Sequence, residues 1–330
     1  MAAALGVLVS CGSVKSGEEV VAASRDSKVV VAYVTSWSEV MPDPQYMTHI
    51  NYAFGHVNES FNGVKIDNEE RLRQIVDLRK QKPELKVLLS IGGWGSGRFS
   101  EMAANDEYRR AFAADCARVV KEFALDGIDI DWEYPTSSMA NISSSPDDTE
   151  NFTLLMQDIR AAIGNEKELT LATVASARYI DFKAILPSVD FVNIMAYDMA
   201  SAPKHHSALY PSGHSGDITS DGAVTAHLKA GVPPSKLVMG MPFYGRGGDG
   251  YPSFQDYNKV GNTDTQYTEK WDEVAQVPYL ADKNDTLVFG FENPRSLAIK
   301  CQYILDKDLL GGMYWDYSGD NEQADLRRTV

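Results

Sequence analysis

Eight short runs of apolar and β-branched residues constrain the fold of this chain more than any other feature of its sequence. They cover residues 29–34, 49–54, 87–92, 127–132, 169–174, 191–197, 237–243 and 311–317. Longer stretches with helical periodicity lie between most of them, at residues 68–81, 105–124, 147–164 and 293–308. This alternation predicts parallel strands joined by crossover helices. Eight such units predict an α/β fold of the (β/α)8 TIM-barrel type.

One interval between the predicted strands is too long for a simple crossover. About fifty residues separate Phe243 from Phe291, and they contain many tyrosines and glycines but no clear helix. We therefore expect a barrel over residues 27–330 with a short insertion, residues 247–292, between its seventh and eighth strands. The main alternative, a doubly wound open sheet, would place a glycine-rich phosphate-binding turn after an early strand. The sequence contains no such turn.

The charge of the chain limits its partners. The formal net charge is −15 at pH 7, and hydrophobic residues make up 44% of the chain, which excludes a disordered or multi-span membrane protein. An acidic surface repels phosphate groups, so we expect neither nucleic acid nor an anionic lipid surface as a partner. A neutral or cationic substrate fits this surface better. No motif in the sequence indicates a metal or an organic cofactor.

The first 26 residues do not resemble part of a barrel. Residues 1–10 are apolar and too few to span a bilayer. Residues 8–11 resemble the lipobox of bacterial lipoproteins, in which Cys11 would be acylated. Residues 12–26 suit a polar tether. We therefore expect a signal or lipoprotein leader, a secreted or cell-envelope location, and membrane contact only through a lipid anchor. The alternative is a disordered leader with a chance cysteine, because no Lys or Arg precedes Lys15.

Three acidic residues alternate with apolar residues in the run that begins at residue 127. Side chains on a strand alternate between its two faces, so Asp129, Asp131 and Glu133 share one face. In a barrel these acids would point inward, with Glu133 at the C-terminal rim, where such barrels carry their active sites. Three shielded carboxylates are not all ionised easily, so we expect at least one to hold a proton near neutral pH.

This row predicts acid–base chemistry. Glu133 is then a candidate general acid with a raised pKa. Asp131 can hold the shared proton. Asp129, two positions earlier on the same face, can adjust how tightly Asp131 holds that proton. Asp126 has the opposite parity and is expected to be structural. The alternatives are a solvent-exposed half-polar strand, which would leave the isoleucines as its buried face, and a divalent-cation site, for which acids in single file make a poor cage.

The acidic run and four further motifs resemble the family 18 glycoside hydrolases, the chitinases and their relatives. The acidic run has the form Asp126-x-x-Asp129-x-Asp131-x-Glu133. The other matches follow in the family's order at Ser90–Trp94, Met195–Asp198, Met241–Arg246 and Gly311–Trp315. The resemblance spans roughly residues 29–320, which is nearly the whole chain.

The resemblance implies a substrate-assisted retaining reaction, an exception to the usual pair of carboxylates. In this family the N-acetyl carbonyl of the substrate attacks the anomeric carbon. Carried over by position, Glu133 would protonate the leaving oxygen and then activate water. Asp131 would orient the acetamido group, Asp129 would share its proton, and Tyr197 would donate its hydroxyl to the carbonyl oxygen.

The resemblance also implies a cleft in which sugar CH faces stack on aromatic rings. The expected substrate-binding residues are Tyr33, Phe54, Trp94, Met195, Asp198, Tyr244, Arg246 and Trp315. Tyr33 and Phe54 could equally be core or rim residues, and Arg246 could be a surface ion pair. We expect His205 and His206, in the loop after Asp198, to be solvated.

One departure from the family pattern concerns the same loop. Residues 200–203 (Ala-Ser-Ala-Pro) occupy the stretch where many family members have another tryptophan, so we expect fewer or weaker sugar subsites. The leading interpretation is an endo-acting hydrolase of β-1,4-linked N-acetylglucosamine polymers or oligomers. The alternatives are an endo-β-N-acetylglucosaminidase acting on N-glycans and a non-catalytic, chitin-binding relative, although such relatives usually lose the acid at Glu133.

Overall fold

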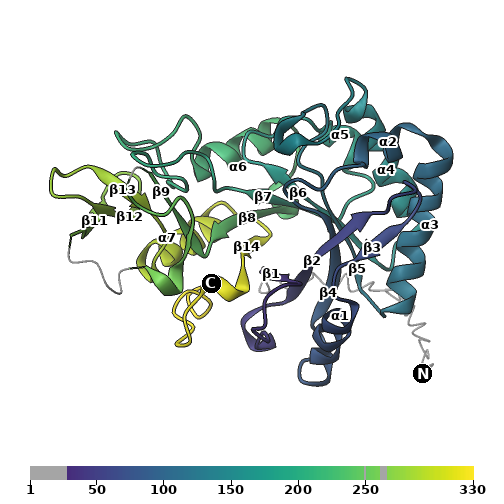
Figure 1. The fold of residues 1–330 in the computed structure, drawn as a ribbon, viewed down its shortest axis with the longest axis horizontal. Coiled ribbons are helices and arrows are strands. Elements are labelled where there is room, and N and C mark those ends of the chain that lie inside the picture. The colour runs from purple at the N-terminus through teal and green to yellow at the C-terminus, as the bar shows by residue number, and fades with distance from the viewer. Residues whose placement is uncertain (1–27, 249, 261–265) are drawn as a thin grey trace, which may run out of the picture.

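The computed structural model describes residues 28–248, 250–260 and 266–330. The expected leader and tether, residues 1–26, and the lipidation site at Cys11 lie outside the described residues. The described chain forms one barrel with a small second sheet at one end (Figure 1). No helix in the described ranges has the length and apolar character needed to cross a membrane.

Eight parallel strands form a closed barrel. In sequence they are β1 (Val29–Thr35), β2 (His49–Val57), β4 (Lys86–Gly92), β5 (Gly127–Asp131), β6 (Glu168–Val174), β7 (Phe191–Met195), β8 (Leu237–Pro242) and β14 (Gly311–Trp315). Each strand pairs with its sequence neighbour in the barrel, and β1 pairs with both β2 and β14, which closes the ring. The short strand β3 (Val64–Ile66) pairs antiparallel with β2. The predicted TIM barrel is confirmed.

Helices surround the barrel, and capping side chains begin most of them. The α-helices are α1 (Glu69–Val76), α2 (Phe99–Ala104), α3 (Asp106–Glu122), α4 (Asp148–Ile163), α5 (Phe182–Ile185), α6 (Ser220–Lys229) and α7 (Pro294–Asp306). Capping side chains begin α1, α3, α5, α6 and α7 but not α2 or α4. Short 3-10 turns are η1 (Pro44–Tyr46), η2 (Asp77–Lys80), η3 (Met139–Asn141), η4 (Pro234–Lys236), η5 (Tyr257–Lys259) and η6 (Tyr317–Gly319). Asn105 caps α3 by accepting from two backbone N–H groups, and Asn293 caps α7 with Pro294 in its first turn.

Strand β5 is buried on both faces, one of which carries apolar side chains and the other acidic side chains. Ile128 and Ile130 are fully buried in the layer between strands and helices. Trp132 lies in the same layer, stacked on Phe99 of α2 at 5.3 Å between ring centroids and edge-on to Phe152 of α4 at 6.0 Å. The opposite face carries the acids into the barrel. The predicted parity is therefore correct, and the solvent-exposed alternative is wrong, because helices cover the apolar face and barrel closure shields the acidic one.

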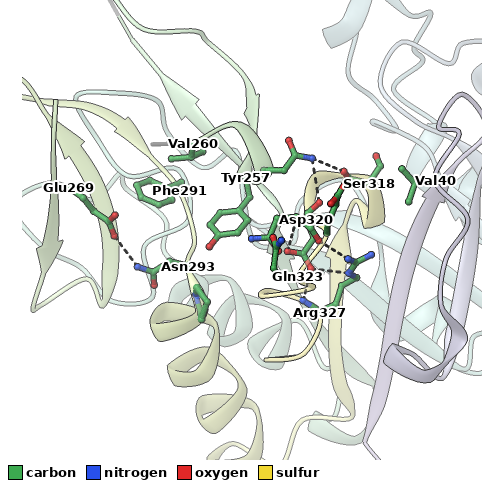
Figure 2. Close-up of a pocket in the computed structure, with 14 residues that line it drawn as sticks. Val40, Tyr257, Val260, Glu269, Phe291, Asn293, Ser318, Asp320, Gln323 and Arg327 are labelled. Carbon is green, nitrogen blue, oxygen red and sulfur yellow. Dashed lines mark hydrogen bonds and ion pairs between the residues drawn. The ribbon is translucent and has the colours of Figure 1, made fainter. Parts of the chain in front are cut away.

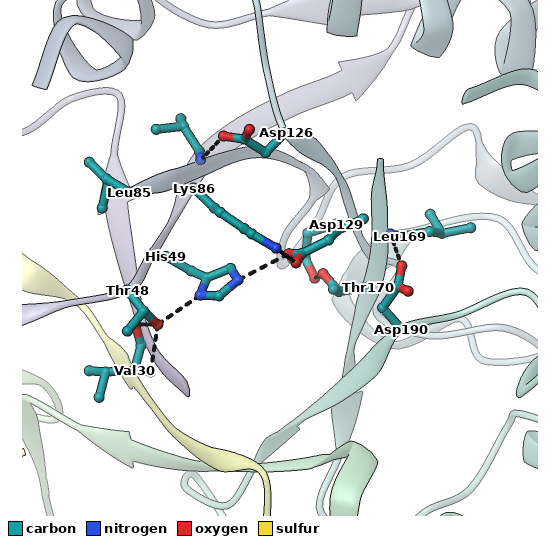
Figure 3. A network of polar contacts seen from close by, with 12 residues as sticks. Val30, Thr48, His49, Leu85, Lys86, Asp126, Asp129, Leu169, Thr170 and Asp190 are labelled. Atoms are coloured by element: carbon teal, nitrogen blue, oxygen red, sulfur yellow. Dashed lines mark hydrogen bonds and ion pairs between the residues drawn. The ribbon is translucent and has the colours of Figure 1, made fainter. Parts of the chain in front are cut away.

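Carboxylates at the N-terminal ends of the strands join neighbouring strands (Figure 3). Asp126 accepts the backbone N–H of Val87 at 2.7 Å and forms an ion pair with Arg79. Asp190 accepts the backbone N–H of Leu169 in the same way, also at 2.7 Å. Asp126 is thus a structural residue at the end of the barrel remote from Glu133, as its parity predicts.

The insertion between β8 and β14 forms an antiparallel five-stranded sheet in the order β10-β9-β13-β12-β11. Its strands are β9 (Tyr244–Gly247), β10 (Gln255–Asp256), β11 (Thr268–Asp272), β12 (Val277–Ala281) and β13 (Leu287–Gly290). The sheet begins at Tyr244, before the expected boundary at residue 247, because β9 follows β8 after a single residue. Tyr244 and Arg246 therefore belong to the small sheet, on strand β9, which continues from barrel strand β8 and pairs with both β10 and β13.

Buried polar contacts hold the loop between β7 and α6 against the small sheet, the segment after β13 and α7. Ser207 Oγ donates to Glu292 Oε1 at 2.6 Å, and Lys300 forms an ion pair with the same carboxylate. The side chains of Lys300 and Glu292 are fully buried. His205 Nε2 lies 3.2 Å from Asp272 Oδ2 on β11. Breaking a buried pair leaves an uncompensated charge, so these contacts fix the position of the loop.

The packing of Trp132 generates the first prediction. Trp132→Ala should lower the free energy of unfolding by about 3–5 kcal/mol, because it opens a cavity between α2 and α4. Chemical denaturation followed by circular dichroism measures the change. Trp132→Phe, which keeps an aromatic ring against Phe99, is the matched control and should lose less. A loss below about 1 kcal/mol for the alanine variant would contradict this account of the packing.

Candidate active site

Asp129 lies in the centre of the barrel, where four side chains from four other strands donate to it. Its Oδ2 accepts from the Tyr33 hydroxyl at 2.9 Å and from Ser90 Oγ at 2.8 Å. Its Oδ1 accepts from Thr170 Oγ1 at 2.6 Å and from Asn193 Nδ2 at 3.3 Å. Burial raises the pKa of Asp129, and these four donors oppose that rise. Asp129 therefore links β1, β4, β6 and β7 around the floor of the site.

Asp131 and Glu133 lie above Asp129 and favour their protonated forms. Burial raises the pKa of Asp131 well above its usual value, and the charges of Glu133 and Asp129 raise it further. Asp131 Oδ1 is buried and has no hydrogen-bond partner among the described residues. Burial raises the pKa of Glu133 to about 7, with the Tyr134 hydroxyl opposing and Asp198 adding to the rise. The row therefore retains a proton near neutral pH, as the alternation of acids predicts.

Tyr197 projects from the end of β7 toward the same space. Its hydroxyl has a weak contact of 3.9 Å to Met313 Sδ and no other hydrogen bond to the described residues. Burial and then the charges of Asp131 and Asp198 raise its pKa well above the usual value. Tyr197 therefore stays protonated at physiological pH and has a hydroxyl proton free to donate to a ligand.

Asp198 is the acid of the cleft that stays ionised. Arg246 donates two hydrogen bonds to it from one edge of its guanidinium, at 2.6 Å from Nε to Oδ1 and 2.9 Å from Nη2 to Oδ2. His206 Nδ1 lies 3.6 Å from Asp198 Oδ1. Burial would raise the pKa of Asp198, but Arg246 and His206 lower it far below the usual range. Arg246 is thus an ion-pair partner of Asp198 in the wall of the cleft, and the side chains of the pair are 32% and 42% exposed.

Aromatic rings form the walls of a cavity of about 660 Å³ above the acids. The indole of Trp315 stacks with Phe54 at 5.6 Å between centroids and with an interplanar angle of 21°. The rings of Tyr134 and Tyr179 stack at 5.5 Å and 13°. Trp37 and Trp94 are 64% and 61% exposed, so their faces are free for a ligand. Flat apolar rings with polar edges are the walls that a pyranose ring requires.

The cavity brings together every expected site residue of the barrel except Asp129, which lies beneath it. Tyr33 serves two purposes, because it lines the cavity and donates to Asp129. Sequence reasoning missed several lining residues, namely Trp37, Tyr134, Met139, Ala172, Val174, Ser176, Arg178, Tyr179, Ile218 and Phe254. Trp37, Tyr134, Ser176, Arg178 and Tyr179 follow a barrel strand within five residues, so their position after a strand could have indicated them.

The expectation that His205 and His206 are solvated is wrong. They are 2% and 1% exposed. Burial lowers the pKa of His205 to about 4, with Asp272 opposing the shift. The loop is covered by the small sheet, which the sequence does not place. His206 supports the Asp198–Arg246 pair instead of contacting water.

No group of three or more His, Cys, Asp or Glu side chains that could hold a metal ion occurs in the described part of the chain. The site can nevertheless transfer protons, because Glu133 can donate at neutral pH and accept once ionised. It also presents a buried carboxyl group and a phenol for a polar substituent of a ligand, and aromatic faces for its apolar surface.

A barrel with an inward row of acids below an aromatic cleft defines a class of carbohydrate-active proteins, and comparisons with known proteins identify the family. The family model described as "Glycosyl hydrolases family 18" matches residues 29–320. The chain belongs to this family, which confirms the resemblance found in the sequence.

Curated relatives agree with this assignment. Chitinase A1 from Niallia circulans is 30% identical over 92% of this chain and 58% of its own length. Mouse chitotriosidase-1 is 31% identical over 87% of this chain and 72% of its own length. The chain therefore spans little more than half of Chitinase A1.

Solved structures show the same architecture. A family 18 N-acetylglucosaminidase from Paenibacillus barengoltzii is 32% identical, with a TM-score of 0.85, over 92% of this chain and 99% of the other. The Group IV chitinase of Ostrinia furnacalis, solved with allosamidin, is 28% identical, with a TM-score of 0.83, over 92% of this chain and 98% of the other.

The raised pKa of Glu133 generates a prediction about stability. Because the folded chain binds this proton more tightly than the unfolded chain, the raised pKa favours folding at low pH. That contribution is lost as pH rises from about 4.5, the ordinary value, through about 7. Glu133→Gln removes the titration, so above pH 7 it should be more stable than the parent, by up to about 3 kcal/mol.

Thermal unfolding of both chains between pH 4 and pH 8 measures this difference. Glu101→Gln, at an exposed position on α2, is the matched control and should follow the parent at every pH. A Glu133→Gln variant that is less stable than the parent at pH 8 would contradict the burial of an ionised Glu133.

Proposed function

We propose that this protein hydrolyses β-1,4-linked N-acetylglucosamine polymers or oligomers, with retention at the anomeric carbon and with assistance from the substrate. The observation that carries the proposal is the position of Glu133. Its carboxyl group lies at the open end of the acidic row, in the aromatic cleft, with its pKa raised to about 7. An acid with this pKa can donate its proton to a glycosidic oxygen at neutral pH.

The first step breaks the glycosidic bond. Glu133 donates its proton to the leaving oxygen while the carbonyl oxygen of the neighbouring N-acetyl group attacks the anomeric carbon. This bond formation gives a cyclic oxazolinium ion. The Tyr197 hydroxyl donates to the attacking carbonyl oxygen and orients it. Asp131, which has an unpaired buried oxygen, accepts from the acetamido N–H and stabilises the positive ring.

The second step reverses the roles of the same groups. The Glu133 carboxylate takes a proton from a water molecule, whose oxygen attacks the anomeric carbon from the face that the leaving group occupied. The carbonyl oxygen departs, and the N-acetyl group is restored. Two displacements leave the product as the β-anomer. Asp129 shares the proton of Asp131. This sharing limits the negative charge on Asp131 while Glu133 loses and regains its proton.

The cleft supports a substrate that is neutral and carries N-acetyl groups. Trp315 and Phe54 offer a stacked platform for a sugar ring, and Trp37 and Trp94 extend the aromatic surface to the outside. The relatives Chitinase A1 and Chitotriosidase-1, at 30% and 31% identity to this chain, also support a chitin-like substrate. We propose endo-type cleavage, because the aromatic surface continues from Trp315 to Trp37, which contacts the same indole and is 64% exposed.

A second candidate is the release of single N-acetylglucosamine residues. It is favoured by the similarity to the Paenibacillus barengoltzii N-acetylglucosaminidase, which covers 99% of that chain. The two candidates differ in their products and not in their mechanism. The product pattern from defined N-acetylglucosamine oligomers separates them, and an N-glycoprotein in the same assay tests the N-glycan alternative.

The proposed acid generates the third prediction. Glu133→Gln should reduce kcat by about 10²–10⁴-fold, because the amide cannot protonate the leaving oxygen. Its affinity for N-acetylglucosamine oligomers should stay close to that of the parent, since the side chain keeps its shape. Glu101→Gln is the matched control. Turnover at the parental rate in the Glu133 variant would remove the proposed acid.

The pH profile follows from the same group. The value of kcat/KM should fall as pH rises through about 7, because the free enzyme loses the proton that Glu133 must donate. The initial product should be the β-anomer by NMR, and the N-unacetylated analogue should be cleaved far more slowly. An α-anomer as the first product would mean inversion and would contradict substrate assistance.

We also propose that Cys11 carries a lipid anchor and that the protein is secreted to a cell envelope. Residues 8–11, Leu-Val-Ser-Cys, support this proposal. Metabolic labelling with a palmitate analogue in a bacterial host should label the parent and not Cys11→Ser. Cys301→Ser is the matched control, because this cysteine is partly buried in α7. Equal labelling of all three chains would contradict the anchor.

A further inference from the structure

A second large cavity lies outside the cleft and has no part in the proposed reaction (Figure 2). Its volume is about 830 Å³. We call it the outer groove and define it by six of its lining residues, Val40, Tyr257, Glu269, Ser318, Glu322 and Gln323. Its walls come from the loop after β1, the small sheet and the C-terminal segment after β14.

The outer groove adjoins the aromatic cleft through three separate segments of chain. In each segment a cleft residue is followed three positions later by a groove residue. Three residues span at most about 10 Å, so the groove begins a short distance beyond the cleft wall. The pairs, with the cleft residue first, are Trp37 and Val40, Phe254 and Tyr257, and Trp315 and Ser318.

Hydrogen bonds hold the floor of the outer groove in place. Asn258 Nδ2 donates to the carbonyl oxygens of Ser318 and Asp320, at 3.2 and 3.3 Å, and so joins the small sheet to the C-terminal segment. Arg327 Nε donates to Asp320 Oδ2 at 2.9 Å. The charges of Arg327 and Asp320 thus compensate each other within the floor. A groove with such a floor is largely formed before a ligand arrives.

The remaining lining groups suit a neutral, hydroxyl-rich ligand. Glu322 and Gln323 are exposed and have no hydrogen bond to the residues that the structure describes. Glu269 uses one carboxylate oxygen to accept from Asn293 at 3.2 Å and keeps the other available. Carboxylates and amides bind sugar hydroxyl groups, while the half-buried ring of Tyr257 offers an apolar face. Glu269 and Glu322 have no ion-pair partner among the described residues, so their charges repel an anionic ligand.

We propose that the outer groove binds the part of a long N-acetylglucosamine chain that extends beyond the cleft, past Trp37 and Trp315. The proposal rests on the proposed function, because it assigns a path to the same substrate. The cleft holds the sugars next to the scissile bond, and the groove adds affinity only for chains long enough to reach it. The length of the sugar chain then controls its affinity, through contacts that are remote from Glu133.

The test compares binding of a long and a short oligomer. The parent for the titration is the full chain with Glu133→Gln, which prevents turnover. Gln323→Trp fills the outer groove with a bulky ring. Isothermal titration should show affinity for the N-acetylglucosamine hexamer falling about tenfold, as expected when one or two hydrogen bonds are lost. Affinity for the trimer, which the proposal confines to the cleft, should stay within about twofold of the parental value.

The matched control is Gln81→Trp, because Gln81 is exposed in the loop before β4, at the opposite end of the barrel. It should bind both oligomers like the parent. If Gln323→Trp fails to fold, the double variant Glu322→Ala and Gln323→Ala removes the polar groups of both exposed side chains without adding bulk, and should weaken hexamer binding selectively. Thermal unfolding checks the fold of each variant.

Two results would overturn the proposal. One is unchanged hexamer affinity in a folded groove variant, and the other is an equal loss of affinity for trimer and hexamer. Hydrolysis of the hexamer by the chain with Glu133 intact is measured in parallel. Absence of hydrolysis counts against the proposed function alone, because the titration does not depend on turnover.

Discussion

The desolvation of a row of carboxyl groups on β5 is the constraint on which the site depends. A buried carboxylate without a partner is costly, so each acid must find donors, share a proton or lie near solvent. Asp129 finds four donors, Asp131 has an unpaired buried oxygen, and Glu133 lies where the row opens into the cleft. The surroundings of the acids thus change along the row, from a fully hydrogen-bonded carboxylate to one at the cavity. Glu133 has a raised pKa because it is buried enough to keep a proton, and it is close enough to the cavity to transfer it.

These different surroundings of the three acids depend on the closure of the barrel. Tyr33, Ser90, Thr170 and Asn193 come from four strands, and each reaches the same carboxylate only when the ring is complete. The other end of the barrel has a different pattern, in which Asp126 and Asp190 join neighbouring strands through backbone N–H groups. Acids at the N-terminal ends thus stabilise the strands, while acids nearer the C-terminal ends supply chemistry.

The small sheet makes a second contribution to the site. It supplies Tyr244, Arg246 and Phe254 to the cleft and Tyr257 and Glu269 to the outer groove. It also covers the loop that contains His205 and His206, and Arg246 with His206 keeps Asp198 ionised. An insertion that the sequence shows only as a long interval therefore shapes both the cleft and the surface next to it.

The sequence by itself determined the barrel, the parity of β5 and the identity of the acids, because these depend on local periodicity. Alternation along residues 127–133 is enough to place Asp129, Asp131 and Glu133 on one face. Only the tertiary structure decided what those acids contact, since Tyr33 lies 96 positions from Asp129 in the sequence. The burial of His205 and His206, the start of the small sheet at Tyr244 and the pairing of Arg246 with Asp198 were decided in the same way. Each depends on which distant segment packs against a loop, and local sequence patterns contain no information about that packing.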